Sequence, residues 1–229
     1  MNDSLLMIAA RAPVAGETKT RLGKAIGMDI AALLYEAFLT DLSERFDRET
    51  RPYDLAWTYT PPERDFGSDL ERVTGRCAPP STLFVPQCGP DWGTRQTNLL
   101  KWGHDHGYAK TVLMASDSPH LSRETIDEAF AALDTHHVVM GRVRDGGYYL
   151  IGMVGHHDVL REVPMSTSSA ADALANACAV RGLALAETEP TFDIDEEPDL
   201  RFLVETLAAD PSLCPVTRAA MAQLGLNRR

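Results

Sequence analysis

Charged side chains and glycines gather in four short segments of this 229-residue sequence: residues 11–22, 115–121, 141–150 and 192–199. Each segment has a composition that suits phosphate or metal chemistry. The formal net charge is -11, so cations are scarce. An acidic protein that handles anionic phosphates has to keep its cations where the phosphates bind, or has to use a metal ion. The four segments are therefore the first places to look for a functional site.

Residues 11–22 (RAPVAGETKTRL) combine a proline and a glycine with several cations. A glycine such as Gly16 lets backbone N–H groups approach a phosphate, while Lys19 and Arg21 supply positive charge. A P-loop has glycine directly before its lysine, whereas Thr18 stands there in this sequence, so we exclude a P-loop ATPase. The pattern predicts an anion-binding loop. An ordinary surface loop with solvated cations is the alternative.

Two segments offer carboxylates for a metal ion. Asp117 follows the apolar run of residues 111–115 and precedes a helix-like segment. Magnesium takes one or two protein carboxylates and leaves its other positions to phosphates and water, which suits Asp117. Asp193 or Asp195, in the acidic run before the helix-like residues 199–208, is the candidate for a second carboxylate. Turn formation at Asp117 and helix-dipole stabilisation at the acidic run are the structural alternatives.

The segment of residues 141–150 (GRVRDGGYYL) lies between two strand-like runs. Its glycines, Gly146 and Gly147, leave space for a substrate. Asp145 is then placed to meet a substrate hydroxyl or a metal ion. Asp-Gly-Gly is equally a hairpin turn, and this alternative stays open.

Apolar periodicity predicts the elements that carry these segments. We expect strands at residues 5–10, 53–59, 82–86, 111–115, 138–141 and 148–153. We expect helices at residues 30–46, 94–106, 123–133, 170–181 and 199–208, with Ser122 as the N-cap of the third, and a polar helix-like stretch between residues 59 and 82. Strands that alternate with helices predict an α/β fold in which a mostly parallel sheet has helices on both faces. Ligands bind beyond the carboxyl ends of the strands in such sheets.

The bulk properties restrict the functional class. No linker or composition shift divides residues 1–229, so we expect a single domain. The acidic charge argues against a nucleic-acid partner. No apolar run reaches the length of a membrane span, and the first residues lack the basic region of a signal peptide. We therefore expect a cytoplasmic protein without a membrane span.

Taken together, the segments resemble a known bacterial glycosyltransferase-like family, domain of unknown function 2064. The family pattern is approximately K-x-P-x-x-G-x-x-K-T-R-L, G-x-x-L-G-x-R, G-T-D-x-P-x-L, G-x-x-x-D-G-G-Y-Y-L-I-G, W-S-T and D-x-D-x-x-x-D-L. The matching stretches are residues 11–22, 89–95, 115–121, 141–152, 165–167 and 193–200. This sequence departs from the pattern at Arg11, Trp92, Ala115, Ser116 and Met165. The changes at Trp92 and Met165 fall where substrate contacts are expected.

The resemblance implies the nucleotide-diphospho-sugar transferase (GT-A) fold, with a Rossmann-like sheet. It also implies kinship with guanylyltransferases of the phospholactate type and with molybdenum-cofactor nucleotidyltransferases. The expected catalytic residues are Lys19, Asp117 and Asp145, and the expected metal ligands are Asp117, Asp193 and Asp195 with Mg²⁺ or Mn²⁺. Nucleotide contacts are expected from Ala10, Arg11, Pro13, Gly16, Lys19, Arg21, Arg95 and Ser116. Substrate contacts are expected from Gly146, Gly147, Ser166 and Thr167.

Three functions remain open at this point. A glycosyltransferase would use a nucleotide-sugar and a small-molecule acceptor, and the resemblance favours it. A nucleotidyltransferase of the guanylyl or cytidylyl type would release pyrophosphate, and the cationic loop of residues 11–22 favours it. A nucleotide-binding regulatory protein without turnover is the third, and the joint presence of Lys19, Asp117 and Asp145 argues against it. The sequence does not define the oligomeric state.

Overall fold

The computed structural model of the chain describes residues 2–47 and 51–227. The strands are β1 (Ser4–Arg11), β2 (Asp54–Thr60), β3 (Leu83–Pro86), β4 (Lys110–Ala115), β5 (Val138–Val143), β6 (Tyr148–Val154) and β7 (Leu185–Thr191). The helices are α1 (Thr20–Ile26), α2 (Met28–Phe46), α3 (Phe66–Thr74), α4 (Trp92–Asp105), α5 (Arg123–Ala132), α6 (Ala170–Val180), α7 (Asp199–Ala209) and α8 (Pro215–Gln223).

Within the described residues, seven strands form one sheet in the order β3-β2-β1-β4-β6-β5-β7. Strand β6 is antiparallel to both of its neighbours, and the other pairs are parallel. The predicted mostly parallel α/β sheet is therefore confirmed. The exception at β6 has a simple cause, because the four residues between β5 and β6 are too few for a parallel crossover.

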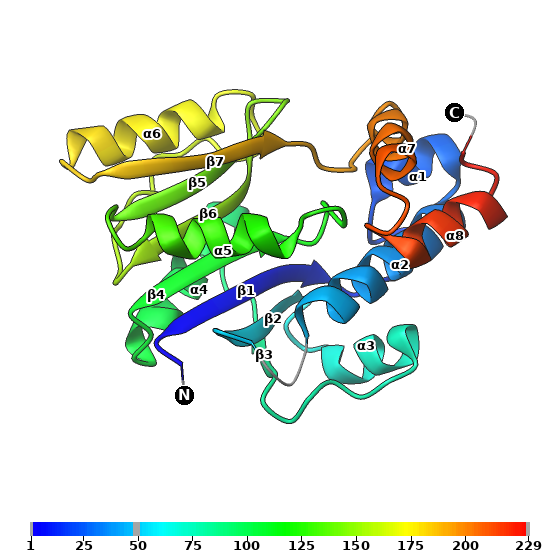
Figure 1. Cartoon of the computed structure of the whole chain (residues 1–229), viewed down its shortest axis with the longest axis horizontal. Helices are drawn as coiled ribbons and strands as arrows, with labels where there is room; N and C mark the ends of the chain where they lie inside the picture. Colours follow the sequence, from blue (N-terminus) through cyan, green and yellow to red (C-terminus); the bar gives the residue numbers. More distant parts are fainter. Residues whose placement is uncertain (1, 48–50, 228–229) are drawn as a thin grey trace.

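Helices cover both faces of the sheet (Figure 1). On one face, α2 and α5 pack on alternate residues of β1 such as Leu6 and Ile8. On the other face, the intervening residues Leu5 and Met7 belong to a second core cluster that includes residues of α4, and α6 packs on β5 and β7. Because side chains of a strand point alternately to opposite faces, a strand covered on both sides is apolar at successive positions, as residues 5–10 of β1 are. This three-layer packing holds the strand ends in fixed positions.

The structure contains three elements that the sequence patterns do not predict: α1, β7 and α8. Strand β7 pairs with β5 at the edge of the sheet and leaves much of its surface exposed. Helix α8 packs on α2, where Asp41 accepts hydrogen bonds from the backbone N–H groups of Val216 and Thr217. Among the described residues, no helix has the length and apolarity required to cross a membrane.

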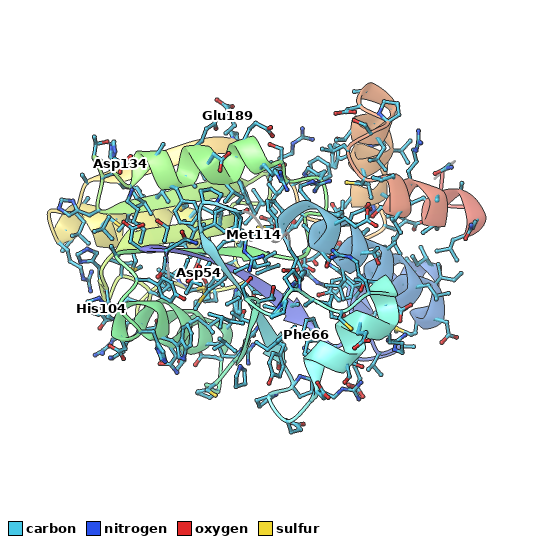
Figure 2. The ribbon with its side chains drawn as sticks, turned by 60° about the horizontal axis from the view of Figure 1, so that its bottom comes forward. Asp54, Phe66, His104, Met114, Asp134 and Glu189 are labelled. Carbon is cyan, nitrogen blue, oxygen red and sulfur yellow. The ribbon has the colours of Figure 1, made fainter. Side chains whose placement is uncertain are left out.

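The topology brings the four segments to one edge of the sheet. Strands β1, β4, β5 and β7 run in the same direction, so their carboxyl ends lie at the same edge. Residues 11–22 follow β1, residues 115–121 follow β4, the turn at Asp145 follows β5, and residues 192–199 follow β7. Met114, the penultimate residue of β4, lies near the middle of the molecule in Figure 2.

Candidate active site

Two adjoining cavities open at this edge. The smaller has a volume of about 290 Å³ and lies at the ends of β1 and β2 and beside residues 17–21. The larger has a volume of about 480 Å³ and lies between β4, β6, the β5–β6 turn and residues 165–170. Both volumes are of the order of small-molecule sites. The residues that line both cavities are Arg21, Trp92, Ala115, Asp117 and Asp195.

The smaller cavity collects most of the residues predicted to contact a nucleotide. It is lined by Ala10, Arg11, Lys19, Arg21, Arg95 and Ser116. Pro13 and Gly16 lie outside its lining and shape the loop instead. Gly16 has φ +80°, a backbone conformation that favours glycine. The structure therefore places the cationic loop beside a cavity. That these residues bind a nucleotide stays a prediction.

Tyr35 and Gln87 also line this cavity, and the sequence patterns do not identify either. The hydroxyl of Tyr35, on α2, accepts a hydrogen bond from the Arg11 N–H at 3.0 Å and lies 2.7 Å from Ser116 Oγ. Burial raises the pKa of Tyr35 to about 12, so the hydroxyl keeps its proton at neutral pH. Gln87 Nε2 donates to the carbonyl oxygens of Ala10 and Thr58. These buried side chains hold the ends of neighbouring strands together below the cavity.

Lys19 links the carboxylates of the two acidic segments. Its ammonium lies 2.5 Å from Asp117 Oδ1 and 3.1 Å from Asp195 Oδ1, and it donates to the Ile194 carbonyl at 2.7 Å. The Lys19 side chain is only 4% exposed. Burial would lower the pKa of Lys19, but the two carboxylates outweigh burial and raise that pKa above its usual value. The ammonium is therefore charged and bound between the carboxylates.

The backbone of Lys19 is unusual as well. The residue is the N-cap of α1 and has φ 48° and ψ 41°, which is the left-handed region. A non-glycine residue in this region carries a local conformational cost that the surrounding contacts must offset. The contacts of the Lys19 ammonium with Asp117, Asp195 and Ile194 can offset this conformational cost. The loop is thus held in place by the side chain that it presents.

Asp195 has two cationic partners. Its second carboxylate oxygen pairs with Arg21, whose side chain is 60% exposed and also reaches Glu196 at 3.5 Å. Burial would raise the pKa of Asp195, but Lys19 and Arg21 hold it below its ordinary value. Asp195 is therefore ionised, and its charge is compensated from both sides.

Arg11 and Arg95 differ from Lys19 and Arg21 because neither has an ion-pair partner within residues 2–47 and 51–227. Both line the smaller cavity. Arg95 lies over the Trp92 ring, with 5.8 Å between the guanidinium carbon and the ring centroid. Its Nε is buried without a hydrogen-bond partner in the described structure. A buried N–H group without a partner is costly, so Arg95 is suited to receive an anionic ligand.

The larger cavity collects the carboxylates. Asp117, Asp145, Asp193 and Asp195 all line it. Burial, together with the neighbouring charges of Asp195, Asp145 and Asp117, raises the pKa of Asp193 to about 7. No hydrogen-bond or ion-pair partner of the Asp193 side chain is present in the part of the chain that the structure describes. The cavity is thus negative on this side.

The β5–β6 turn is both a hairpin turn and a wall of this cavity. Asp145 Oδ1 accepts a hydrogen bond from the Gly147 N–H at 2.9 Å, as in an ordinary turn, and both residues line the cavity. Gly146 lies outside the lining, with φ +92°. A Cβ on Gly146 would stand 2.0 Å from the Ser168 carbonyl oxygen. Gly146 therefore allows the turn to contact the loop that carries Ser166 and Thr167, both of which also line the cavity.

Part of the lining of the larger cavity is apolar. Trp92, Tyr148 and Met165 form it together with aliphatic residues of β4 and β6. The Tyr148 hydroxyl donates to Gln96 Oε1 at 3.2 Å and lies 3.3 Å from Met165 Sδ. Trp92 and Met165 are two of the positions where the sequence departs from the family pattern, and the structure places both in the cavity wall.

The carboxylates suit a divalent cation in their chemistry. Within the described residues, no three histidine, cysteine, aspartate or glutamate side chains come together to hold a metal ion. A magnesium site needs fewer, because phosphate oxygens and water supply the remaining ligands. Asp117 is 38% exposed, and Asp193 has no partner among the described side chains. Burial, followed by the negative charge of neighbouring aspartates, raises the pKa of Asp193, and a cation would neutralise that negative charge. The donor set therefore fits a metal bound together with phosphate.

Solved structures define the class of this fold. A candidate nucleotide-diphospho-sugar transferase from Desulfovibrio desulfuricans G20 is 27% identical, covers 99% of both chains and has a TM-score of 0.86. The 4-diphosphocytidyl-2C-methyl-D-erythritol synthase of Anaerococcus prevotii DSM 20548 is 12% identical over 88% of this chain and 94% of its own, with a TM-score of 0.57. A cytidylyltransferase from Leptospira borgpetersenii serovar Hardjo-bovis is 11% identical over 93% and 97%, with a TM-score of 0.51. The chain thus has the nucleotide-diphospho-sugar transferase fold.

The family assignment is more specific. Residues 52–167 match the model of a family described as uncharacterized protein conserved in bacteria, domain of unknown function 2064, and the chain belongs to this family. The sequence-based expectations for the family and the fold are confirmed. No curated protein matches the sequence.

Proposed function

We propose that this protein transfers a glycosyl group from a nucleotide-sugar to a small acceptor, with a divalent cation. The observation that carries the proposal is the pair of cavities that meet at Asp117, with cations beside one and carboxylates beside the other. A nucleotide-sugar has the same polarity, because its diphosphate is anionic and its sugar is rich in hydroxyl groups. The diphosphate would lie at the junction, and the sugar would extend into the larger cavity.

The nucleotide would occupy the smaller cavity. Arg11 and Arg95 supply guanidinium groups that are free of carboxylate partners among the described residues, and guanidinium binds phosphate oxygens through paired N–H groups. Tyr35 and Gln87 fix the strand ends that form the cavity floor. Lys19 keeps Asp117 and Asp195 in position and limits their mutual repulsion.

The reaction would take place at the junction of the cavities. A hydroxyl oxygen of the acceptor would attack the sugar carbon that is bonded to the diphosphate. The carbon–oxygen bond would break with its electron pair on the diphosphate, and Asp145 would take the hydroxyl proton. Mg²⁺ or Mn²⁺, held by Asp117 with Asp193 or Asp195, would neutralise charge on the leaving diphosphate. Arg21 lines both cavities and adds positive charge at the same place.

Nucleotidyl transfer is the second candidate. The observation that favours it is the position of residues 17–21, which line the smaller cavity directly after the β1 loop. A triphosphate is longer than a diphosphate and would bring its terminal phosphates toward these residues. In that case the acceptor would attack the innermost phosphate, and pyrophosphate would leave.

A thermal-shift panel followed by product analysis tests both proposals. Nucleoside triphosphates and nucleotide-sugars are added to the full chain with and without magnesium. A ligand at about 100 times its dissociation constant adds about 2.7 kcal/mol of stability. Stabilisation by a nucleotide-sugar, followed by slow release of nucleoside diphosphate, supports glycosyl transfer. Stabilisation by triphosphates alone, with pyrophosphate release when an acceptor is present, supports nucleotidyl transfer.

Matched variants assign the roles. Arg95→Gln removes the guanidinium of the smaller cavity and is expected to weaken nucleotide binding. Asp145→Asn keeps the side-chain shape and is expected to reduce turnover far more than nucleotide affinity. Asp117→Asn is expected to remove the magnesium dependence of binding while the chain stays folded. If none of the ligands stabilises the parent protein, the chain is not a nucleotide-dependent transferase.

A further inference from the structure

The charge of the larger cavity restricts what it can bind. Among the described residues that line it, four are aspartates and a single one, Arg21, is a cation. Arg21 is already paired with Asp195 and Glu196. Lys19 compensates Asp117 from behind the cavity wall. Asp145 and Asp193 have no ion-pair partner among the residues that the structure describes.

The ligands proposed above do not reverse this charge. A divalent cation carries two positive charges, and the diphosphate diester of a nucleotide-sugar carries two negative charges. Together they add no net charge to the junction. An anionic acceptor in the larger cavity would therefore still lie beside the exposed Asp145 and the half-buried Asp193, and like charges repel.

Another part of the lining has a different character. Trp92, Tyr148 and Met165 present apolar surface to the cavity, and the Tyr148 hydroxyl is already bonded to Gln96. Carboxylates accept hydrogen bonds from hydroxyl groups, and aromatic rings pack against C–H surface. A molecule with hydroxyl groups on one side and C–H groups on the other matches both walls.

We infer that the acceptor is an uncharged, hydroxyl-bearing compound such as a sugar or polyol, and that this cavity excludes acceptors bearing a phosphate or carboxylate. The inference rests on the proposed function, because it concerns the second substrate of that site. It is carried by the four aspartates, the paired state of Arg21 and the apolar wall. It applies equally to glycosyl and nucleotidyl transfer.

The test compares alcohols with their own phosphate monoesters on the full chain. Ligand-observed NMR measures binding of glucose with glucose 6-phosphate, ribose with ribose 5-phosphate and glycerol with glycerol 3-phosphate. Each pair is measured with the smaller cavity filled by a nucleoside diphosphate and magnesium, and again without them. At least one alcohol is expected to bind, and its monoester is expected to bind about ten-fold more weakly or worse. Added salt is expected to narrow this difference.

Ser168 provides a matched pair of variants. It is exposed, lines the larger cavity and has no side-chain hydrogen bond among the described residues. Ser168→Arg adds a cation and is expected to bring the monoester to within about three-fold of the alcohol, because it offsets the repulsion. Ser168→Gln adds similar bulk without charge and is expected to leave the difference unchanged.

The outcomes separate this inference from the proposed function. The inference of an uncharged acceptor is overturned if the monoesters bind as tightly as the alcohols. It is also overturned if no alcohol in the panel binds. A Ser168→Gln variant that changes the preference as much as Ser168→Arg also overturns it, because bulk and not charge would then decide. Binding of the nucleoside diphosphate is measured in the same samples. If it does not bind, that result counts against the proposed function. The comparison of alcohols and monoesters without nucleotide then still decides the acceptor class.

Discussion

Replacing Lys19 with methionine tests how the site is held together. Lys19→Met keeps the length and the apolar stem of the side chain but removes the ammonium between Asp117 and Asp195. An ion pair at about 4 Å contributes about 4 kcal/mol at the effective dielectric constant of about 20 that suits sites near a surface. Desolvation of the ammonium costs several kcal/mol, and solvent weakens the ion pair with Asp117, whose side chain is 38% exposed. We therefore expect Lys19→Met to lower the free energy of unfolding by about 2 kcal/mol at pH 7.5.

The loss has a defined pH dependence. Asp193 already has a pKa of about 7, above its unfolded value of 3.8, so its charge destabilises the folded chain as pH rises through that range. Removing Lys19 takes away the cation that lowers the pKa of both Asp195 and Asp193, so more carboxyl groups titrate in the same range. The difference in stability between the parent and the variant is therefore expected to be larger at pH 7.5 than at pH 4.5, where Asp195 of the parent is still ionised and paired with Lys19.

Thermal or urea unfolding at the two pH values measures this difference. A change of about 2 kcal/mol corresponds to about 4–8 °C in Tm for a chain of this size. Lys24→Met is the matched control, because Lys24 lies on the same short helix, is exposed and has no ion-pair partner among the described residues. The reasoning is refuted if the two variants lose the same stability, or if the loss at Lys19 is as large at pH 4.5 as at pH 7.5.

Three further predictions concern neighbouring groups. Burial and the charge of Arg45 lower the pKa of His120 to about 4, so its contribution to stability is present above 6.5 and is lost as pH falls through 4. Chemical denaturation of His120→Gln across this range is expected to lack that loss of about 3 kcal/mol. Tyr35→Phe is expected to cost about 1 kcal/mol of stability and to weaken nucleotide binding in calorimetry, and unchanged affinity would contradict this. Gly146→Ala is expected to destabilise the folded chain by roughly 1–3 kcal/mol or more and to reduce turnover, because the Cβ of the new alanine would meet the Ser168 backbone. A Tm equal to that of the parent would contradict the proposed contact.

The sequence predicts most of the sheet because the buried strands carry continuous apolar runs. Residues 5–10 and 111–115 are apolar because β1 and β4 are covered on both faces. Strand β7 lacks this signal, since it is a half-exposed edge strand with Pro190. Helix α1 has only seven residues, includes Gly23, and is too short for a clear helical period.

The candidate site was predictable where function follows a strand end. Asp117 and Asp145 were identified because each follows a strand of a mostly parallel sheet. Tyr35 was not, because on an apolar helix face it has the pattern of a core residue. The contact between Lys19 and Asp195 joins positions 176 residues apart, and no local spacing indicates it. Contacts of this kind depend on the connections between strands, which periodicity does not encode.

The lining of the two cavities divides along the chain. The smaller cavity takes most of its residues from positions 9–95, and the larger takes most of its residues from positions 113–195. Strand β4 and Asp117 are the boundary where both contribute. If the proposed function holds, the part of the gene that encodes the nucleotide side is largely separate from the part that encodes the acceptor side. On that proposal, chimeras of family members joined within β4 are expected to exchange the acceptor while keeping the nucleotide, and the two specificities could diverge independently in evolution.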